Sequence, residues 1–163
     1  MKKVFIIGGT MGVGKTTVCQ MLKFKMDRAV FLDGDRCWDP RIVTEETKRM
    51  VKDNICHILN NFIHCSEYKN ILFCWVMHEQ SIIDDIIRGL DTENVMIRTI
   101  SLTCDTNSLE ERLREDIMSG VRKADILPRS LDRLPMYDDL DTLKIDTSYL
   151  MPDEVAELIA HLA

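Results

Sequence analysis

The sequence contains no long apolar run, no CxxC cysteine pair and no excess of positive charge. The continuous apolar run at residues 71–76 is far too short to cross a membrane. The formal net charge is −6, whereas binding to nucleic acid or to an anionic membrane surface needs clustered lysine and arginine. The sequence therefore predicts no nucleic-acid partner and no membrane partner.

The six cysteines also lack the spacing of a metal site or of a disulfide framework. Several of them lie inside apolar stretches, which favours buried, reduced thiols in a cytosolic protein over a zinc site. The amino-terminal lysines are followed by an apolar run that ends at Gly8, too short for a secretory signal. We expect a cytoplasmic protein. The cysteines are Cys19, Cys37, Cys56, Cys65, Cys74 and Cys104.

The chain of 163 residues fits one domain, predicted over 1–163, and no repeat, linker or low-complexity tract divides it. Strand-like and helix-like segments alternate, which is typical of an α/β fold with a parallel sheet. We therefore predict a three-layer α/β/α sandwich with a five-stranded parallel sheet. The predicted strands are 4–8, 29–32, 71–76, 95–102 and 142–145, and the helices are 15–26, 44–63, 81–90, 108–117 and a last one near 152.

Two helix starts have recognisable capping patterns. Thr44 is followed by two glutamates, which suit the first turn of a helix. Ser108 and Glu111 have the spacing of a capping box, which predicts that the fourth helix opens at Ser108.

Residues 9–16 read Gly-Thr-Met-Gly-Val-Gly-Lys-Thr and match the phosphate-binding pattern GxxxxGK[ST] between a predicted strand and a predicted helix. Glycines allow a tight turn that aims backbone N–H groups at phosphate oxygens, and the helix start adds positive potential. We expect Lys15 to contact the β- and γ-phosphates of ATP and the Thr16 hydroxyl to coordinate Mg²⁺. The predicted nucleotide-binding residues are Gly9, Thr10, Met11, Gly12, Val13, Gly14, Lys15, Thr16 and Thr17.

A phosphate-binding loop does not by itself define a reaction. Three functions are compatible with it: a kinase of a small molecule, an ATPase or GTPase, and a nucleotide-binding protein without turnover. The sequence has no NKxD motif for guanine, and the apolar run 71–76 is followed by Met-His-Glu rather than by an acidic pair. These absences disfavour a GTPase and an AAA-type motor ATPase, and favour the kinase.

The chain resembles the small P-loop kinases that include gluconate, shikimate and adenylylsulfate kinases and the chloramphenicol phosphotransferases. The resemblance rests on residues 9–17, on Asp33-Gly34-Asp35 after the second strand, and on the arginine-rich segment 112–133. It implies a nucleoside-kinase-like P-loop NTPase fold with a short lid, and the use of ATP and Mg²⁺. In such relatives an aspartate after the second strand faces the acceptor hydroxyl or helps to hold Mg²⁺ through water.

This resemblance makes Asp33 and Asp35 candidates for the catalytic base, with Asp33 also a candidate metal ligand beside Thr16. Residues 116–133 resemble the lid, whose arginines neutralise charge on the transferring phosphoryl group. Arg122 and Arg129 are the favoured catalytic arginines, and the alternative is a solvated charged helix.

The acceptor is a small molecule in this interpretation, with a hydroxyl or a phosphate as the receiving group. A nucleoside or nucleotide, a sugar-like metabolite and an antibiotic all remain open. The rival hypothesis is a nucleotide-dependent binding or regulatory protein with little turnover. The sequence does not define the oligomeric state.

Overall fold

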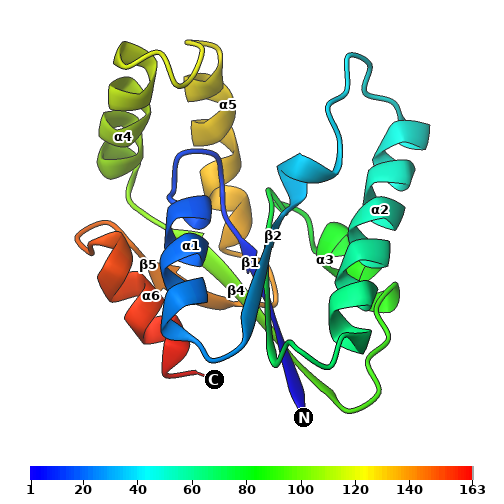
Figure 1. Ribbon diagram of the computed structural model, residues 1–163. Helices are drawn as coiled ribbons and strands as arrows, with labels where there is room; N and C mark the ends of the chain where they lie inside the picture. Colours follow the sequence, from blue (N-terminus) through cyan, green and yellow to red (C-terminus); the bar gives the residue numbers. More distant parts are fainter. Residues whose placement is uncertain (163) are drawn as a thin grey trace.

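A computed structural model describes residues 1–162 as one parallel sheet covered by helices on both faces (Figure 1). The five strands follow the order β2-β3-β1-β4-β5, and every neighbouring pair is parallel. The predicted α/β class, parallel sheet and strand number are confirmed; residue 163 of the predicted domain lies outside the described residues. The strands are β1 Lys2–Gly8, β2 Ala29–Asp33, β3 Asn70–Cys74, β4 Val95–Thr103 and β5 Leu143–Asp146.

The helices form the two outer layers. Helices α1 and α6 lie against each other on one face, with α4 and α5 above them, and α2 and α3 cover the other face (Figure 1). The helices are α1 Lys15–Lys25, α2 Glu45–His64, α3 Gln80–Arg88, α4 Thr106–Met118, α5 Ile126–Arg133 and α6 Pro152–Ala160, with short 3-10 turns η1 Gly34–Cys37 and η2 Leu134–Tyr137.

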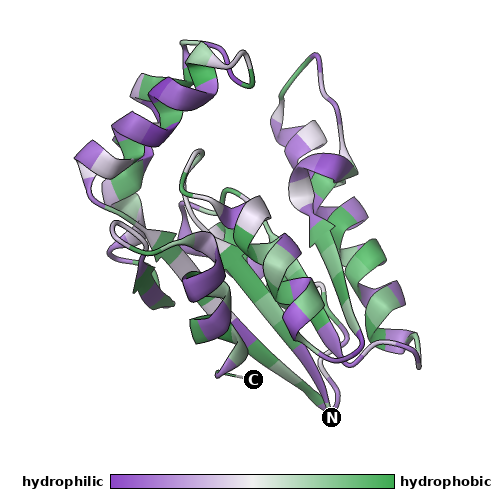
Figure 2. Cartoon of the chain, turned by 60° about the vertical axis from the view of Figure 1, so that its left-hand side comes forward, coloured by the Kyte–Doolittle hydropathy of each residue, from purple (hydrophilic) through white to green (hydrophobic). Residues whose placement is uncertain are grey.

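The central strand β1 explains why both faces need a cover. Phe5 and Ile7 point into the core under α1 and α6, whereas Val4 and Ile6 point into the core under α2 and α3. All four are essentially buried, as expected for a parallel strand with helices on both sides. Figure 2 shows the consequence, apolar strands in the middle and hydrophilic surfaces on the outer faces of the helices.

The strand register brings several loops to one edge of the sheet. Cys74, the last residue of β3, pairs with Ile7 of β1 on one side and with Asp33 of β2 on the other. The loops that follow β1, β2 and β3 therefore start side by side. Ligands of open α/β sheets bind at this carboxyl edge.

The start of α4 corrects one sequence interpretation. The helix begins at Thr106, and its cap is Asp105, whose side chain accepts a hydrogen bond from the Ser108 backbone N–H at 2.7 Å. The predicted capping box at Ser108 was wrong because Asp105 is an equally good cap three residues earlier. The third strand likewise ends at Cys74 rather than at residue 76.

All six cysteines are free, and Cys19, Cys74 and Cys104 are buried while the other three are half-buried. Over residues 1–162, no helix combines the length and the apolar character that a membrane crossing requires.

The hydrogen bonds that cap the start of α2 give a test of the stability of this fold. The Thr44 hydroxyl accepts from the Thr47 backbone N–H at 3.2 Å, and the Thr47 hydroxyl accepts from the Thr44 N–H at 2.8 Å. Thr44→Ala is expected to lower the free energy of unfolding by about 1 kcal/mol, measured by urea denaturation. Thr92→Ala is the control, since Thr92 is exposed; equal stability of both variants would contradict a working cap.

Candidate functional site

The loop after β1, residues 9–17, has the backbone shape of a phosphate cradle. Gly9, Gly12 and Gly14 all have positive φ angles, of 155°, 86° and 103°. A Cβ on Gly9 would lie 2.7 Å from the Val13 side chain and 2.9 Å from the Leu102 carbonyl oxygen. Gly14 is the N-cap of α1, so the free N–H groups of the first helical turn belong to the loop. The loop thus presents several backbone donors to one anion.

Lys15 is the first residue of α1 and turns back over the loop. Its ammonium donates to the carbonyl oxygens of Gly9 and Thr10, at 2.8 and 2.9 Å. Burial lowers the pKa of the Lys15 ammonium, and the thiol of Cys74 and the carboxylate of Asp35 partly oppose this shift. The cation is therefore held at the loop in a half-buried position, where a charge acts more strongly on a phosphate than it does in bulk water.

Thr16 and Asp33 form the oxygen pair that fits Mg²⁺. The Thr16 hydroxyl donates to Asp33 Oδ2 at 2.7 Å, although the two residues lie on different elements. Within the described part of the chain, no group of three or more His, Cys, Asp or Glu side chains could hold a metal alone. Mg²⁺ in kinases is held by one or two protein oxygens together with water and phosphates, and this pair suits that arrangement.

Asp35 lies two residues further along, in the turn η1. Its backbone N–H donates to Asp33 Oδ1 at 3.1 Å, while its own carboxylate is exposed and accepts from Trp75 Nε1 at 3.0 Å. The sequence did not single out Trp75, which was assigned to the third strand. No local pattern could have found it, because the two residues are 40 positions apart.

Arg112 of α4 reaches the loop from the opposite side. Its guanidinium donates to the Thr147 hydroxyl at 3.0 Å, to the Thr147 carbonyl at 2.6 Å and to the Val13 carbonyl at 3.4 Å. It lines two clefts beside the loop. A cleft of about 260 Å³ is lined also by Gly12, Gly14, Lys15, Thr16, Thr17, Glu115, Asp116 and Arg122.

The second cleft, of about 550 Å³, extends from the loop toward the segment after β5. It runs from Gly14 and Thr17 past Arg112 to the apolar side chains of Leu150 and Val155. One end is thus next to the phosphate loop, and the other has the apolar lining that suits a nucleotide base.

The two favoured arginines occupy different surroundings. Arg122 lines the smaller cleft with Lys15 and pairs with Asp116 at 2.9 Å. Arg129 lies on α5, about half exposed, and pairs with Asp125 at 3.2 Å. The structure thus brings Arg122 to the loop but leaves Arg129 at an ordinary surface ion pair.

Helix α5 is tied to the phosphate loop. The buried Thr10 hydroxyl donates to the Ser130 carbonyl at 2.9 Å and lies 2.9 Å from the Ser130 hydroxyl, which in turn donates to the Met11 carbonyl. The second half of the predicted lid is therefore attached to the loop. The connection between Met118 and Ile126 has no such attachment to the loop.

Behind the loop lies a group of polar side chains with few partners. Tyr137 is fully buried and packs against Gly8, and its hydroxyl makes no hydrogen bond of normal geometry. His78 Nδ1 is also buried without a partner. Burial, followed by the charge of Arg133, lowers the pKa of the His78 imidazole. Burial raises the pKa of the Tyr137 hydroxyl and the positive charge of Arg133 partly opposes that shift, so this charge acts on both groups.

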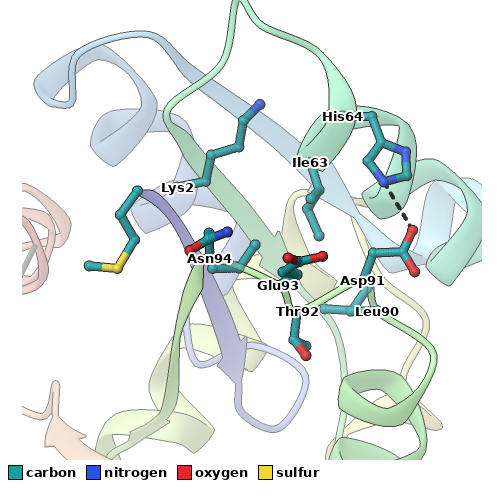
Figure 3. A pocket seen from close by; sticks show the side chains of 10 residues that line it. Lys2, Ile63, His64, Leu90, Asp91, Thr92, Glu93 and Asn94 are labelled. Atoms are coloured by element: carbon teal, nitrogen blue, oxygen red, sulfur yellow. Dashed lines mark ion pairs between the residues drawn. The ribbon is translucent and has the colours of Figure 1, made fainter.

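A larger cavity, of about 830 Å³, lies at the amino ends of the strands (Figure 3). It is lined by Lys2, Asn94 and the pair of His64 and Asp91, whose Nε2 and Oδ2 atoms are 3.0 Å apart. The phosphate loop is at the opposite edge of the sheet. The size of a cavity therefore does not locate the phosphate site in this protein.

The fold and the site together define a P-loop nucleotide-binding domain of the kinase-like type. More particularly, the chain belongs to the family described as AAA domain, which matches residues 6–130. The sequence disfavours an AAA-type motor ATPase, and the family match does not test that activity. In the structure β3 is followed by Trp75 and Val76 rather than by an acidic pair. No curated protein matches the sequence.

Several solved structures have the same fold. The Deinococcus radiodurans tunicamycin resistance protein superposes with a TM-score of 0.71 at 18% identity, over 99% of this chain and 95% of that one. A gluconokinase from Sinorhizobium meliloti gives 0.70 at 16% identity, covering 95% and 87%. The Mycobacterium tuberculosis APS kinase, solved with AMPPNP and APS, gives 0.66 at 12% identity, covering 99% and 96%. At these identities the likeness shows the fold.

The loop glycines give a matched pair of variants. Gly9→Ala combines a strained φ with two close contacts, and should lower the free energy of unfolding by roughly 3 kcal/mol. Gly14→Ala has a positive φ but nothing within 4 Å, and should cost about 1 kcal/mol. Thermal and urea unfolding check both values. A Gly14 variant as unstable as the Gly9 variant would contradict the crowding around Gly9.

Proposed function

We propose that this protein transfers the γ-phosphoryl group of ATP to a small-molecule acceptor. The observation that carries the proposal is the contact between Thr16 and Asp33, at 2.7 Å. It joins the end of the phosphate loop to the turn after β2, so that Asp35 lies beside the loop. A carboxylate next to the terminal phosphate is what a kinase needs and what phosphate binding alone does not require.

The two aspartates take different roles in this proposal. Asp33 is engaged by the Thr16 hydroxyl and the Asp35 backbone, so it suits the coordination of Mg²⁺ through water. Asp35 is exposed and its carboxylate is oriented from one side only. It is free to accept the proton of an acceptor hydroxyl as the new oxygen–phosphorus bond forms.

The cations around the loop complete the assignment. ATP would supply the phosphoryl group, and Mg²⁺ would neutralise charge on its phosphates. Lys15 and Arg122 share one cleft and suit the stabilisation of negative charge during transfer. Arg112 bridges the loop to Thr147 beside the second cleft, which extends toward the segment after β5. We place the nucleotide base in that cleft. Arg129 stays a predicted lid residue, which only a movement of the lid would bring to the phosphates.

In this proposal the acceptor binds above the carboxyl ends of β2 and β3. Arg133 is half-buried, and no carboxylate of residues 1–162 forms an ion pair with it. Its charge acts on both His78 and Tyr137. This uncompensated cation supports an acceptor that carries a negatively charged group as well as a hydroxyl. The proposal includes neither a nucleic-acid nor a membrane partner, and it places the protein in the cytoplasm.

The alternative is a nucleotide-dependent binding or regulatory protein with little turnover. The polar attachment of α5 to the loop through Ser130 and Thr10 would pass a change at the loop to α5. Slow hydrolysis without dependence on any acceptor would favour this alternative.

The first experiment measures ADP release from Mg²⁺-ATP across a panel of nucleosides, nucleotides, sugar acids and hydroxylated antibiotics. We expect a rise with one class of acceptor. Lys15→Ala should reduce the acceptor-dependent rate by at least about 100-fold, because the half-buried cation at the phosphates is lost.

Lys23→Ala is the matched control, since it removes a lysine of the same helix whose ammonium bonds Gln20 and lies over the exposed Phe24 ring. It should keep the wild-type rate. Tight ATP binding without a rise for any acceptor in the panel, or an unchanged rate in Lys15→Ala, would argue against the transferase.

The division of roles between the aspartates gives a second prediction. Asp33→Asn should raise the Mg²⁺ concentration for half-maximal activity about tenfold. Asp35→Asn should leave this concentration unchanged and lower kcat by about 100-fold or more at saturating Mg²⁺. Steady-state kinetics over a Mg²⁺ titration separates the two effects. If the two variants exchanged these phenotypes, the assignment of base and metal ligand would have to be reversed.

A further inference from the structure

Trp75 is the first residue after β3, and its position is fixed by the sheet. Its backbone N–H donates to the Ile7 carbonyl at 3.2 Å, which continues the pairing of β3 with β1 past Cys74. The side chain therefore starts at the point where β1 ends and the phosphate loop begins. Its indole N–H reaches Asp35 at 3.0 Å.

Gly34 makes this contact possible. A Cβ on Gly34 would lie 2.6 Å from Trp75 Cγ and 2.7 Å from Cδ1, so the indole lies directly on the backbone of the turn. Gly34 does not have a positive φ. The indole, rather than the backbone conformation, is thus the reason that a side chain does not fit there.

A second aromatic ring also packs against the indole. Trp38 meets Trp75 edge to face, with ring centroids 6.5 Å apart and an angle of 77° between the rings. Trp75 thus contacts both Gly34 and Trp38. A side chain restrained by two such neighbours can direct its single donor to one acceptor with little loss of entropy.

The Asp35 carboxylate has no other fixed partner within residues 1–162. Thr16 bonds Asp33 instead, and the Asp35 backbone N–H also bonds Asp33. The indole N–H therefore determines which way the carboxylate faces. An exposed aspartate without it would rotate among several orientations.

We propose that Trp75 is a positioning residue, which holds the Asp35 carboxylate toward the acceptor hydroxyl. The inference rests on the proposed function, since it assigns Asp35 as the base. The indole occupies one oxygen of the carboxylate, Oδ1, and leaves Oδ2 for the acceptor. Orientation of a base within a few tenths of an ångström is worth large factors in rate.

Trp75→Phe tests the inference because it keeps an aromatic ring and removes the donor. We expect kcat to fall about tenfold to a hundredfold, with the KM for ATP unchanged. Tyr68→Phe is the matched control, since it keeps the ring of a second edge-to-face pair, with Phe62, and removes a polar group just before β3 begins, at the edge of the sheet opposite Asp35; it should keep kcat within about twofold. Gly34→Ala should reproduce the Trp75→Phe defect by displacing the indole.

A double-mutant cycle separates positioning from a merely structural role. If Trp75 acts through Asp35, Trp75→Phe should cost nothing further in kcat once Asp35→Ala is present. Independent losses that multiply in the double variant would overturn the inference. So would a Trp75→Phe enzyme with the wild-type kcat.

The hydrogen bond itself is measured without turnover. The two tryptophans give two indole N–H signals in a ¹H–¹⁵N spectrum, assigned with Trp38→Phe. The Trp75 signal should shift and exchange faster with water in Asp35→Ala, and an unmoved signal would overturn the inference whatever the activity. A wild-type protein with this bond but no acceptor-dependent turnover would overturn the proposed function instead, and with it the role of Trp75 in transfer.

Discussion

The parallel pairing of β1 with β3 and β4 is the constraint on which the rest of the molecule depends. Because Cys74 pairs with both Ile7 and Asp33, three strands end at the same level of the sheet. The phosphate loop, the Asp33–Asp35 turn and Trp75 each follow one of these ends. A shift of β3 by one residue would turn its side chains to opposite faces and would remove Trp75 from Asp35. The register of the buried strands thus sets the geometry of the site.

The phosphate loop is held from several directions rather than by its own sequence alone. Ser130 bonds it from α5, Arg112 bonds it from α4, and Thr16 links its end to Asp33. The Ser130 bond is buried and the Arg112 bond is partly buried, where an unpaired polar group costs more than it does in water, whereas the Thr16–Asp33 bond is exposed. A loop fixed in this way loses little entropy when it binds a phosphate, which is the basis of preorganised transfer sites.

Much of the architecture follows from patterns along the chain. The apolar strands, the amphipathic helices and the GxxxxGK[ST] motif are local or periodic features, and the structure confirms the sheet and the class of fold. Helix ends depend on which of several capping residues is used: Asp105 caps α4 in place of the predicted Ser108, because both residue types can accept from the same backbone donors. Both Arg122 and Arg129 were predicted to act at the loop. The structure puts Arg122 beside the loop, whereas Arg129 pairs with Asp125 at the surface. Charge content alone does not show which side of a helix faces a site.

The sequence by itself determined that the chain has a phosphate-binding motif, since the spacing of Gly9, Gly14 and Lys15 is local and stands between a strand and a helix. It also marked Asp33 and Asp35 as the carboxylates to examine. Only the tertiary structure decided how they differ, with Asp33 bonded to Thr16 and Asp35 bonded to Trp75. These contacts join residues 17 and 40 positions apart. They depend on strand register and side-chain packing, which no local pattern in the sequence encodes.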